Sequence, residues 1–96
     1  MSDLNKVLLV GRVGKDPIHK KVANTSVSKF SMATSKRYEK DGEWKEATQW
    51  HQIVVWGKQA EAVVTYVSQG SLVFVDGEIR SRSYESGGQT KWITEI

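Results

Sequence analysis

The chain has 96 residues, which is enough for one small domain with a modest hydrophobic core. It contains no cysteine and has 2 histidines far apart in the sequence, which excludes a disulfide framework and argues against a metal site or another cofactor. The formal net charge of +3 permits a polyanionic partner but does not require one.

No targeting or membrane-spanning segment is predicted. The first residues contain no apolar signal core, and no apolar run is long enough to cross a bilayer. We therefore expect a soluble intracellular protein without a membrane partner. The chain has no internal repeat, linker or low-complexity segment, so residues 1–96 are predicted to form a single domain.

Residues 5–12 predict a first strand that is apolar on both faces. Side chains alternate along a strand, so Val7 and Leu9 point one way while Leu8 and Val10 point the other way. A strand that is apolar on both faces is usually covered on both. In a domain this small, a neighbouring subunit could supply the second cover.

A short basic segment and a second strand follow. Residues 18–22 are rich in lysine and have only a weak pattern. Residues 27–34 predict a strand with Phe30 and Met32 on one face and Lys29 on the other.

Residues 35–47 predict a polar hairpin, because Asp41-Gly42 is a strong turn signal between two arms. Tyr38 and Trp44 lie on these arms. Four cations surround the two rings, namely Lys36, Arg37, Lys40 and Lys45. Trp44 could pack against a residue across the hairpin, but an arm this polar is hard to bury, which favours exposure.

Residues 49–56 predict a strand with two unlike faces. Trp50, Gln52 and Trp56 share one face, whereas His51 shares the other with the apolar Ile53 and Val55. Two indoles on one face suit either a core or a surface on which bases stack, and the pattern alone does not decide between these two roles. The polar Gln52 between them favours an open surface.

Over residues 57–70 the spacing of the apolar residues changes to that of an amphipathic helix, and Gly70 lies where the helix is expected to end. Its apolar face contains Ala60, Val63, Val64 and Val67. Residues 72–84 predict a fourth strand, one face of which carries Arg80, Arg82 and Tyr84. After a turn at residues 85–89, residues 91–96 predict the last strand.

This order predicts an all-β fold. Five strands with one helix between the third and fourth, and a long hairpin between the second and third, match a five-stranded OB-fold barrel. Phe74 and Trp92 are interpreted as packing or interface residues, and Tyr66 as structural.

Three classes of function are compatible with such a barrel. Aromatic rings interleaved with cations suit single-stranded nucleic acid, because any base can stack on a ring while lysine and arginine meet the phosphates. An enzyme is not expected, because no nucleophile motif, paired carboxylates or phosphate-binding loop accompanies His51. A protein-, oligosaccharide- or RNA-binding OB module remains an alternative, since the fold alone does not decide.

Seven short segments, in their order and spacing, resemble the bacterial-type single-stranded DNA-binding proteins. They are NKVLLVG (residues 5–11), GKDP (14–17), ATS (33–35), EATQWH (46–51), GKQAE (57–61), GS (70–71) and GEIRSR (77–82). The resemblance covers essentially the whole chain.

The resemblance implies an OB-fold subunit, usually part of a homotetramer, that wraps single-stranded DNA without sequence preference. Such proteins act in the cytoplasm on the nucleoid and protect the strand during DNA replication, recombination and repair. The aromatic platforms implied are Tyr38, Trp50, Trp56 and Tyr84. The basic contacts implied are Lys6, Lys58, Arg80 and Arg82, followed by Lys36 and Arg37. The subunit interface implied contains Val7, Leu8, Leu9 and Val10, with His51 nearby.

The chain also departs from the family pattern. Tyr38 and Tyr84 stand where tryptophan is often found and Trp56 where phenylalanine is often found, and each change keeps a ring for stacking. Gln52 stands where a basic residue is common. The family's acidic C-terminal tail is not in this sequence, so replication and repair proteins are expected as partners only of a full-length product that has one.

Overall fold

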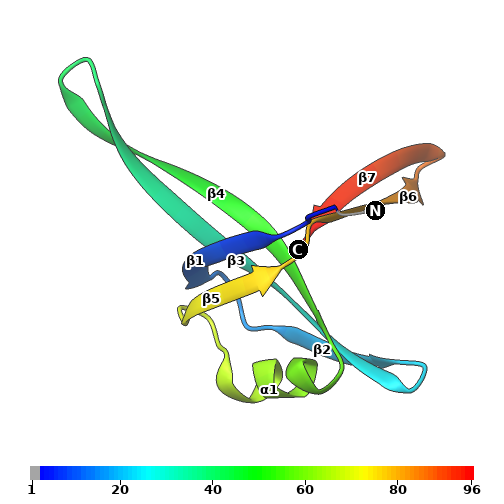
Figure 1. The fold of residues 1–96 in the computed structure, drawn as a ribbon. Helices are drawn as coiled ribbons and strands as arrows, with labels where there is room; N and C mark the ends of the chain where they lie inside the picture. The colour runs from blue at the N-terminus through cyan, green and yellow to red at the C-terminus, as the bar shows by residue number, and fades with distance from the viewer. Residues whose placement is uncertain (1–2) are drawn as a thin grey trace.

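A computed structural model describes residues 3–96 (Figure 1). The first two residues of the predicted domain lie outside the described residues. The elements are β1 (Val7–Val13), β2 (Ile18–Val22), β3 (Thr25–Lys40), β4 (Glu43–Trp56), α1 (Lys58–Tyr66), β5 (Leu72–Gly77), β6 (Arg80–Ser86) and β7 (Gln89–Glu95).

Five strands form one antiparallel sheet that curls around the core. The order is β2-β3-β1-β5, and β4 pairs with β3. β6 and β7 form a separate two-stranded sheet, whose end is tied to β4 by two backbone hydrogen bonds. The N–H of Val54 donates to the carbonyl of Ile96 over 2.8 Å, and the N–H of Ile96 donates to the carbonyl of Gln52 over 2.9 Å. The all-β fold, the curled five-stranded sheet and the helix between β4 and β5 are confirmed, and they have the layout of an OB-fold barrel.

The structure differs from the expected strands in two places. The weakly patterned segment is a full strand, β2, which pairs with β3 from Ile18 opposite Lys29 to Val22 opposite Thr25. The expected strand over residues 72–84 is interrupted, so that β5 pairs with β1 whereas β6 pairs with β7.

A long-range contact accompanies the interruption between β5 and β6. The side chain of Asn5 accepts a hydrogen bond from the N–H of Ile79 and donates one to its carbonyl, both over 2.9 Å. These bonds satisfy backbone groups of Ile79 that a strand would otherwise pair in a ladder.

The helix is shorter than expected, because it ends at Tyr66 rather than near Gly70. Val67 already has the extended backbone angles φ −107° and ψ 132°. The last turn is rich in β-branched residues, which form helices less readily than straight-chain residues. A tight turn follows, in which the N–H of Ser71 donates to the carbonyl of Ser68 over 3.0 Å.

The core lies between the inner face of the sheet and α1. Its buried apolar side chains are Val13, Phe30, Met32 and Ile53, and Leu9 packs against them. At one end of the barrel Ala60 is fully buried, and its carbonyl accepts a hydrogen bond of 2.6 Å from the hydroxyl of Ser28. The helix thus covers the end of the curled sheet with both apolar contacts and a buried polar link.

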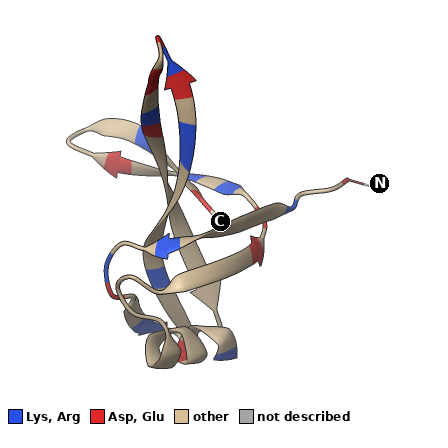
Figure 2. Ribbon diagram, turned by 90° about the vertical axis from the view of Figure 1, so that its left-hand side faces the viewer, with Lys and Arg blue, Asp and Glu red and all other residues tan. Residues whose placement is uncertain are grey.

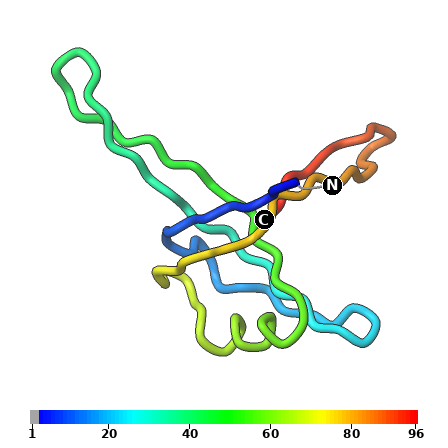
Figure 3. The backbone as a smooth tube through the Cα atoms, in the orientation of Figure 1, coloured from blue at the N-terminus to red at the C-terminus, as the bar shows by residue number. Residues whose placement is uncertain are grey.

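The β3–β4 and β6–β7 hairpins project from the barrel, as the backbone trace shows (Figure 3). The longer one continues β3 and β4 outward until Lys40 pairs with Glu43. At its tip Asp41 and Gly42 have positive φ angles of 54° and 78°, as a type I′ turn requires, which confirms the predicted hairpin. The hairpins explain why the radius of gyration is 16.0 Å, against about 13 Å for a compact chain of this length.

Candidate nucleic-acid interface

The outer face of β4 presents three tryptophans. The pairing with β3 places Trp44, Trp50 and Trp56 on one face, and Ile53 with His51 on the face that holds the core. The indoles are 66%, 54% and 56% exposed, respectively. None of the three therefore fills the core, and their rings are available to a ligand.

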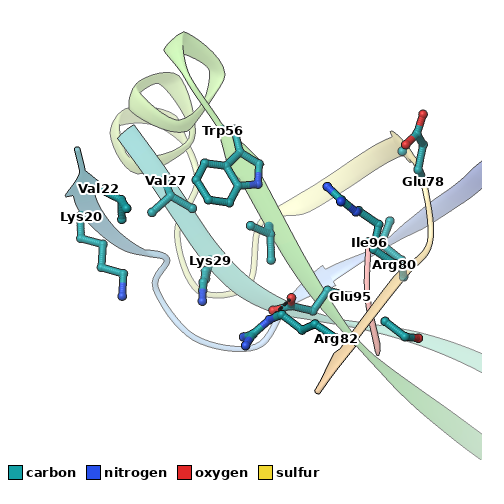
Figure 4. Close-up of a pocket in the computed structure, with 13 residues that line it drawn as sticks. Lys20, Val22, Val27, Lys29, Trp56, Glu78, Arg80, Arg82, Glu95 and Ile96 are labelled. Atoms are coloured by element: carbon teal, nitrogen blue, oxygen red, sulfur yellow. Dashed lines mark hydrogen bonds and ion pairs between the residues drawn. The ribbon is translucent and has the colours of Figure 1, made fainter. Parts of the chain in front are cut away.

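Trp56 stands in an open pocket of about 630 Å³ (Figure 4). This volume lies in the range of pockets that hold small organic ligands. Cations from three strands line it, namely Lys20 of β2, Lys29 of β3, and Arg80 and Arg82 of β6. Two carboxylates, those of Glu78 and Glu95, lie among the same lining residues. The pocket therefore combines one large ring with a predominantly positive wall.

Lys20 and Lys29 are site residues that the sequence alone did not predict. In the sheet, Val27 lies opposite both Lys20 of β2 and Trp56 of β4, and Lys29 lies two residues further along β3. The position of Lys29 on the face opposite Phe30 was the available signal. Lys20 gave none, because its neighbour across the sheet depends on a pairing that the weak local pattern does not specify.

The predicted basic contacts differ in their partners. The Nε of Arg82 lies 2.8 Å from Oε1 of Glu95, and the Nζ of Lys6 lies 3.5 Å from Oδ2 of Asp76. Among residues 3–96, Arg80 forms no such ion pair. The hydrogen bond and the charge of Glu95 raise the pKa of Arg82 above its already high ordinary value. This guanidinium therefore stays charged, but its charge is partly neutralised by the carboxylate with which it is paired.

The resemblance implies binding of single-stranded DNA, and for such binding we expect Arg80 and Arg82 to contribute unequally to the salt dependence. Arg80→Ala should reduce the slope of log K against log salt concentration by about 0.7, the value for one phosphate contact on a single strand. Arg82→Ala should reduce it less, because Glu95 already neutralises that cation. Titrations with oligo-dT at several salt concentrations measure both slopes, and equal reductions would contradict this ranking.

The β3–β4 hairpin carries an aromatic ring on each face. The guanidinium carbon of Arg37 lies 5.5 Å from the ring centroid of Trp44, a cation–π geometry. Tyr38 pairs with Lys45 and therefore lies on the other face, as does Lys36. Acidic and basic residues both occupy this hairpin (Figure 2). The β3–β4 hairpin thus presents aromatic rings on which the bases of a single-stranded nucleic acid could stack. Its mixed acidic and basic side chains create no strong net electrostatic field.

The β6–β7 hairpin also has two unlike faces. Tyr84 pairs with Lys91 and shares its face with Arg80 and Arg82. Trp92 lies opposite Ser83 on the other face and is 71% exposed. The packing role expected for it is therefore not found within residues 3–96.

The remaining predicted contacts lie apart from the pocket around Trp56. Lys58 is the exposed first residue of α1, and Lys6 directly precedes β1 beside Asp76. Tyr66 is 82% exposed, so the structural role expected for it is wrong. The structure thus brings Trp56, Arg80 and Arg82 together and distributes the other rings over two hairpins.

The outer face of β1 and β5 has an exposed apolar centre, flanked by Asp76 opposite Leu8 and by Arg12 opposite Leu72. Leu8 and Val10 are exposed, and Phe74 lies directly opposite Val10 with Leu72 two residues away. The other predicted interface residues point inward or are partly enclosed. Val7 and Leu9 lie on the inner face, and His51 Nε2 lies 2.9 Å from the hydroxyl oxygen of Thr34.

No grouping of three or more His, Cys, Asp or Glu side chains suited to a metal ion occurs within residues 3–96. In the same part of the chain, no helix has the length and apolar character needed to cross a membrane.

The curled sheet, the single helix and the surface of exposed rings and cations define an OB-fold protein. The model of the single-strand binding protein family matches residues 4–96, and the chain belongs to this family. Solved structures agree: "Plasmodium falciparum SSB complex with ssDNA" superposes with a TM-score of 0.92 at 36% identity, covering 100% of this chain and 87% of that one.

Curated relatives are similar over nearly the whole chain. Single-stranded DNA-binding protein 1 of Chlorobaculum tepidum is 39% identical over 97 residues, which cover 97% of this chain and 60% of the relative. Single-stranded DNA-binding protein 3 of Clostridium acetobutylicum is 42% identical over 96 residues, with 97% and 65% covered. The chain therefore spans less than two thirds of the length of these two relatives.

Proposed function

We propose that this domain binds single-stranded DNA without sequence preference and protects it during replication, recombination and repair. The observation that carries the proposal is the pocket in which the exposed ring of Trp56 stands among Lys20, Lys29 and Arg80. A base stacks on the ring while the phosphates on either side of it meet the cations. Family membership and the DNA-bound structural neighbour support the same ligand.

The absence of sequence preference follows from the kind of contact. Every base has a π-face, so stacking on indole or phenol rings accepts all four bases. Lysine and arginine side chains meet the phosphates, which are the same in every nucleotide. The rings proposed are Tyr38, Trp44, Trp50, Trp56 and Tyr84, and the cations proposed are Lys6, Lys20, Lys29, Lys36, Arg37, Lys58, Arg80 and Arg82.

A fluorescence titration tests this function. Adding oligo-dT at low salt should quench the intrinsic tryptophan emission, because stacked bases perturb the exposed indoles. A parallel titration with oligo-U separates DNA from RNA preference. An OB module that binds only proteins would show no quenching with either oligonucleotide, and that result would overturn the proposal.

We also propose that the exposed apolar face of β1 and β5 is covered by further copies of the chain in a homotetramer. Leu8, Val10, Leu72 and Phe74 are neighbouring exposed apolar residues, and an exposed apolar cluster of this kind marks an interaction site. Packing of this face against a second copy would bury Leu8 and Val10, while the edge of β1 that β3 leaves unpaired before Arg12 could pair with its own copy. We propose that His51 lies near this contact.

Placing a charge in this apolar face should dissociate the assembly. Leu8→Glu combined with Phe74→Glu is expected to lower the mass measured by light scattering from about four times 10.8 kDa to that of one chain. Tyr66→Glu, on the exposed side of α1, is the control and should leave the mass unchanged. A wild-type chain that is monomeric at micromolar concentration would contradict the tetramer.

We propose a binding role rather than an enzymatic one, carried by a single domain over residues 1–96. Family membership supports action in the cytoplasm on the nucleoid. Recruitment of replication and repair proteins is proposed only for a full-length product that carries an acidic C-terminal tail.

A further inference from the structure

The ring of Trp50 rests on a glycine. A Cβ atom built on Gly14 would lie 2.6 Å from Cζ3 and 3.0 Å from Cη2 of Trp50, and 3.3 Å from the hydroxyl oxygen of Ser31. Real Cβ atoms do not approach a ring carbon to 2.6 Å, because the two would overlap. The six-membered ring of this indole therefore occupies space that a side chain at position 14 would take.

Backbone hydrogen bonds hold Gly14 against the ring. Its N–H donates to the carbonyl of Ser31 on β3 over 2.9 Å. The preceding residue, Val13, is fixed as well: its N–H donates to Ser71 over 3.0 Å, and its carbonyl accepts from the N–H of Gly70 over 2.8 Å. Because these bonds tie the end of β1 to two other segments, the chain at Gly14 has no freedom to move away from a larger side chain.

We infer that Gly14 is a positioning residue for Trp50 in DNA binding. Part of the indole lies on the Gly14 backbone while 54% of the residue remains exposed, so the ring is held in place before a base arrives. A ring that is already ordered loses less conformational entropy when a base stacks on it. Trp44 differs, because it lies on the projecting hairpin and contacts the exposed side chain of Arg37.

This inference rests on the proposed binding of single-stranded DNA and adds a residue that itself offers no ring, charge or side-chain donor. Gly14→Ala should displace the Trp50 ring and weaken oligo-dT binding. The largest loss expected is that of Trp50→Ala, about 5- to 150-fold for one stacked base.

A double-mutant cycle with Trp50→Phe tests the inference, because phenylalanine keeps a ring but lacks the Cζ3 and Cη2 atoms that meet Gly14. Oligo-dT affinity is measured for wild type, G14A, W50F and G14A/W50F, together with thermal unfolding of each. G14A should lower the affinity of the wild type severalfold and leave that of W50F unchanged. G87A controls for a glycine-to-alanine change away from Trp50: its added Cβ meets no atom within 4 Å, so only its φ of 60° disfavours a side chain.

The outcomes separate this inference from the proposed function. Equal losses from G14A in both backgrounds, or no loss in either, would overturn the positioning role while DNA binding itself stands. If G14A does not fold, a folded G14A/W50F that binds like W50F supports the contact, and failure of both to fold overturns it. A wild-type chain that does not bind oligo-dT refutes the proposed function instead.

Discussion

Replacing Trp50 and Trp56 together with alanine is expected to weaken oligo-dT binding by about 2–6 kcal/mol, because each stacked base contributes about 1–3 kcal/mol. The dissociation constant should therefore rise by at least about 30-fold. Both residues are more than half exposed, so the folded structure should survive their loss. Competition or anisotropy titrations measure the affinity, since the variant lacks two of the fluorescent reporters.

Tyr66→Ala is the matched control for this variant. Tyr66 is another exposed aromatic residue, but it lies on α1 outside the pocket around Trp56. It should bind oligo-dT like the wild type. If the double tryptophan variant unfolds, or if it binds as tightly as Tyr66→Ala, the two indoles are not the platforms of this protein.

Gly11→Ala is expected to lower the free energy of unfolding by about 3 kcal/mol, at the upper end of the range for overpacked sites. A Cβ atom on Gly11 would lie 2.2 Å from the carbonyl oxygen of Ala33 and 3.0 Å from Cε of Met32. The first of these is a backbone atom of β3, so it cannot move aside without disturbing the pairing of Arg12 with Ala33. The melting temperature should fall by about 12–24 °C.

Gly87→Ala again supplies the comparison for stability. Its φ of 60° disfavours a side chain by about 1–2 kcal/mol, but the added Cβ would meet no neighbour. Thermal unfolding followed by circular dichroism measures both variants. A smaller loss for Gly11→Ala than for Gly87→Ala would show that β1 and β3 can separate at little cost.

Local patterns in the sequence were sufficient for the fold class and for the main hairpin. Asp41-Gly42 specified the turn chemically, and the alternation around Trp50 and Ile53 separated the outer from the inner face of β4. These features depend on neighbours within a few residues, which is why the sequence shows them directly.

Features that depend on distant partners could not be predicted. The break before β6 involves Asn5, which is 74 residues from Ile79, and Arg82 meets a carboxylate 13 residues away. Lys20 reaches the pocket around Trp56 only through the pairing of β2 with β3. The close approaches at Gly11 and Gly14 likewise require strands to cross in space, and a glycine in a sequence does not say what lies opposite it.

The β3–β4 hairpin has a consequence for how stability is distributed. Every residue from 35 to 49 is exposed, so the part of the hairpin beyond Trp50 is held by the hydrogen bonds of its own two strands and by no contact with the buried apolar cluster. We expect such a segment to open locally from the tip inward, independently of the barrel. We therefore expect weak cooperativity between the hairpin and the core, so that a ligand bound to the hairpin would leave the packing around Met32 and Ile53 intact. The strands β3 and β4 thus contribute both to the packed barrel and to an outer hairpin that is expected to deform more easily than the barrel.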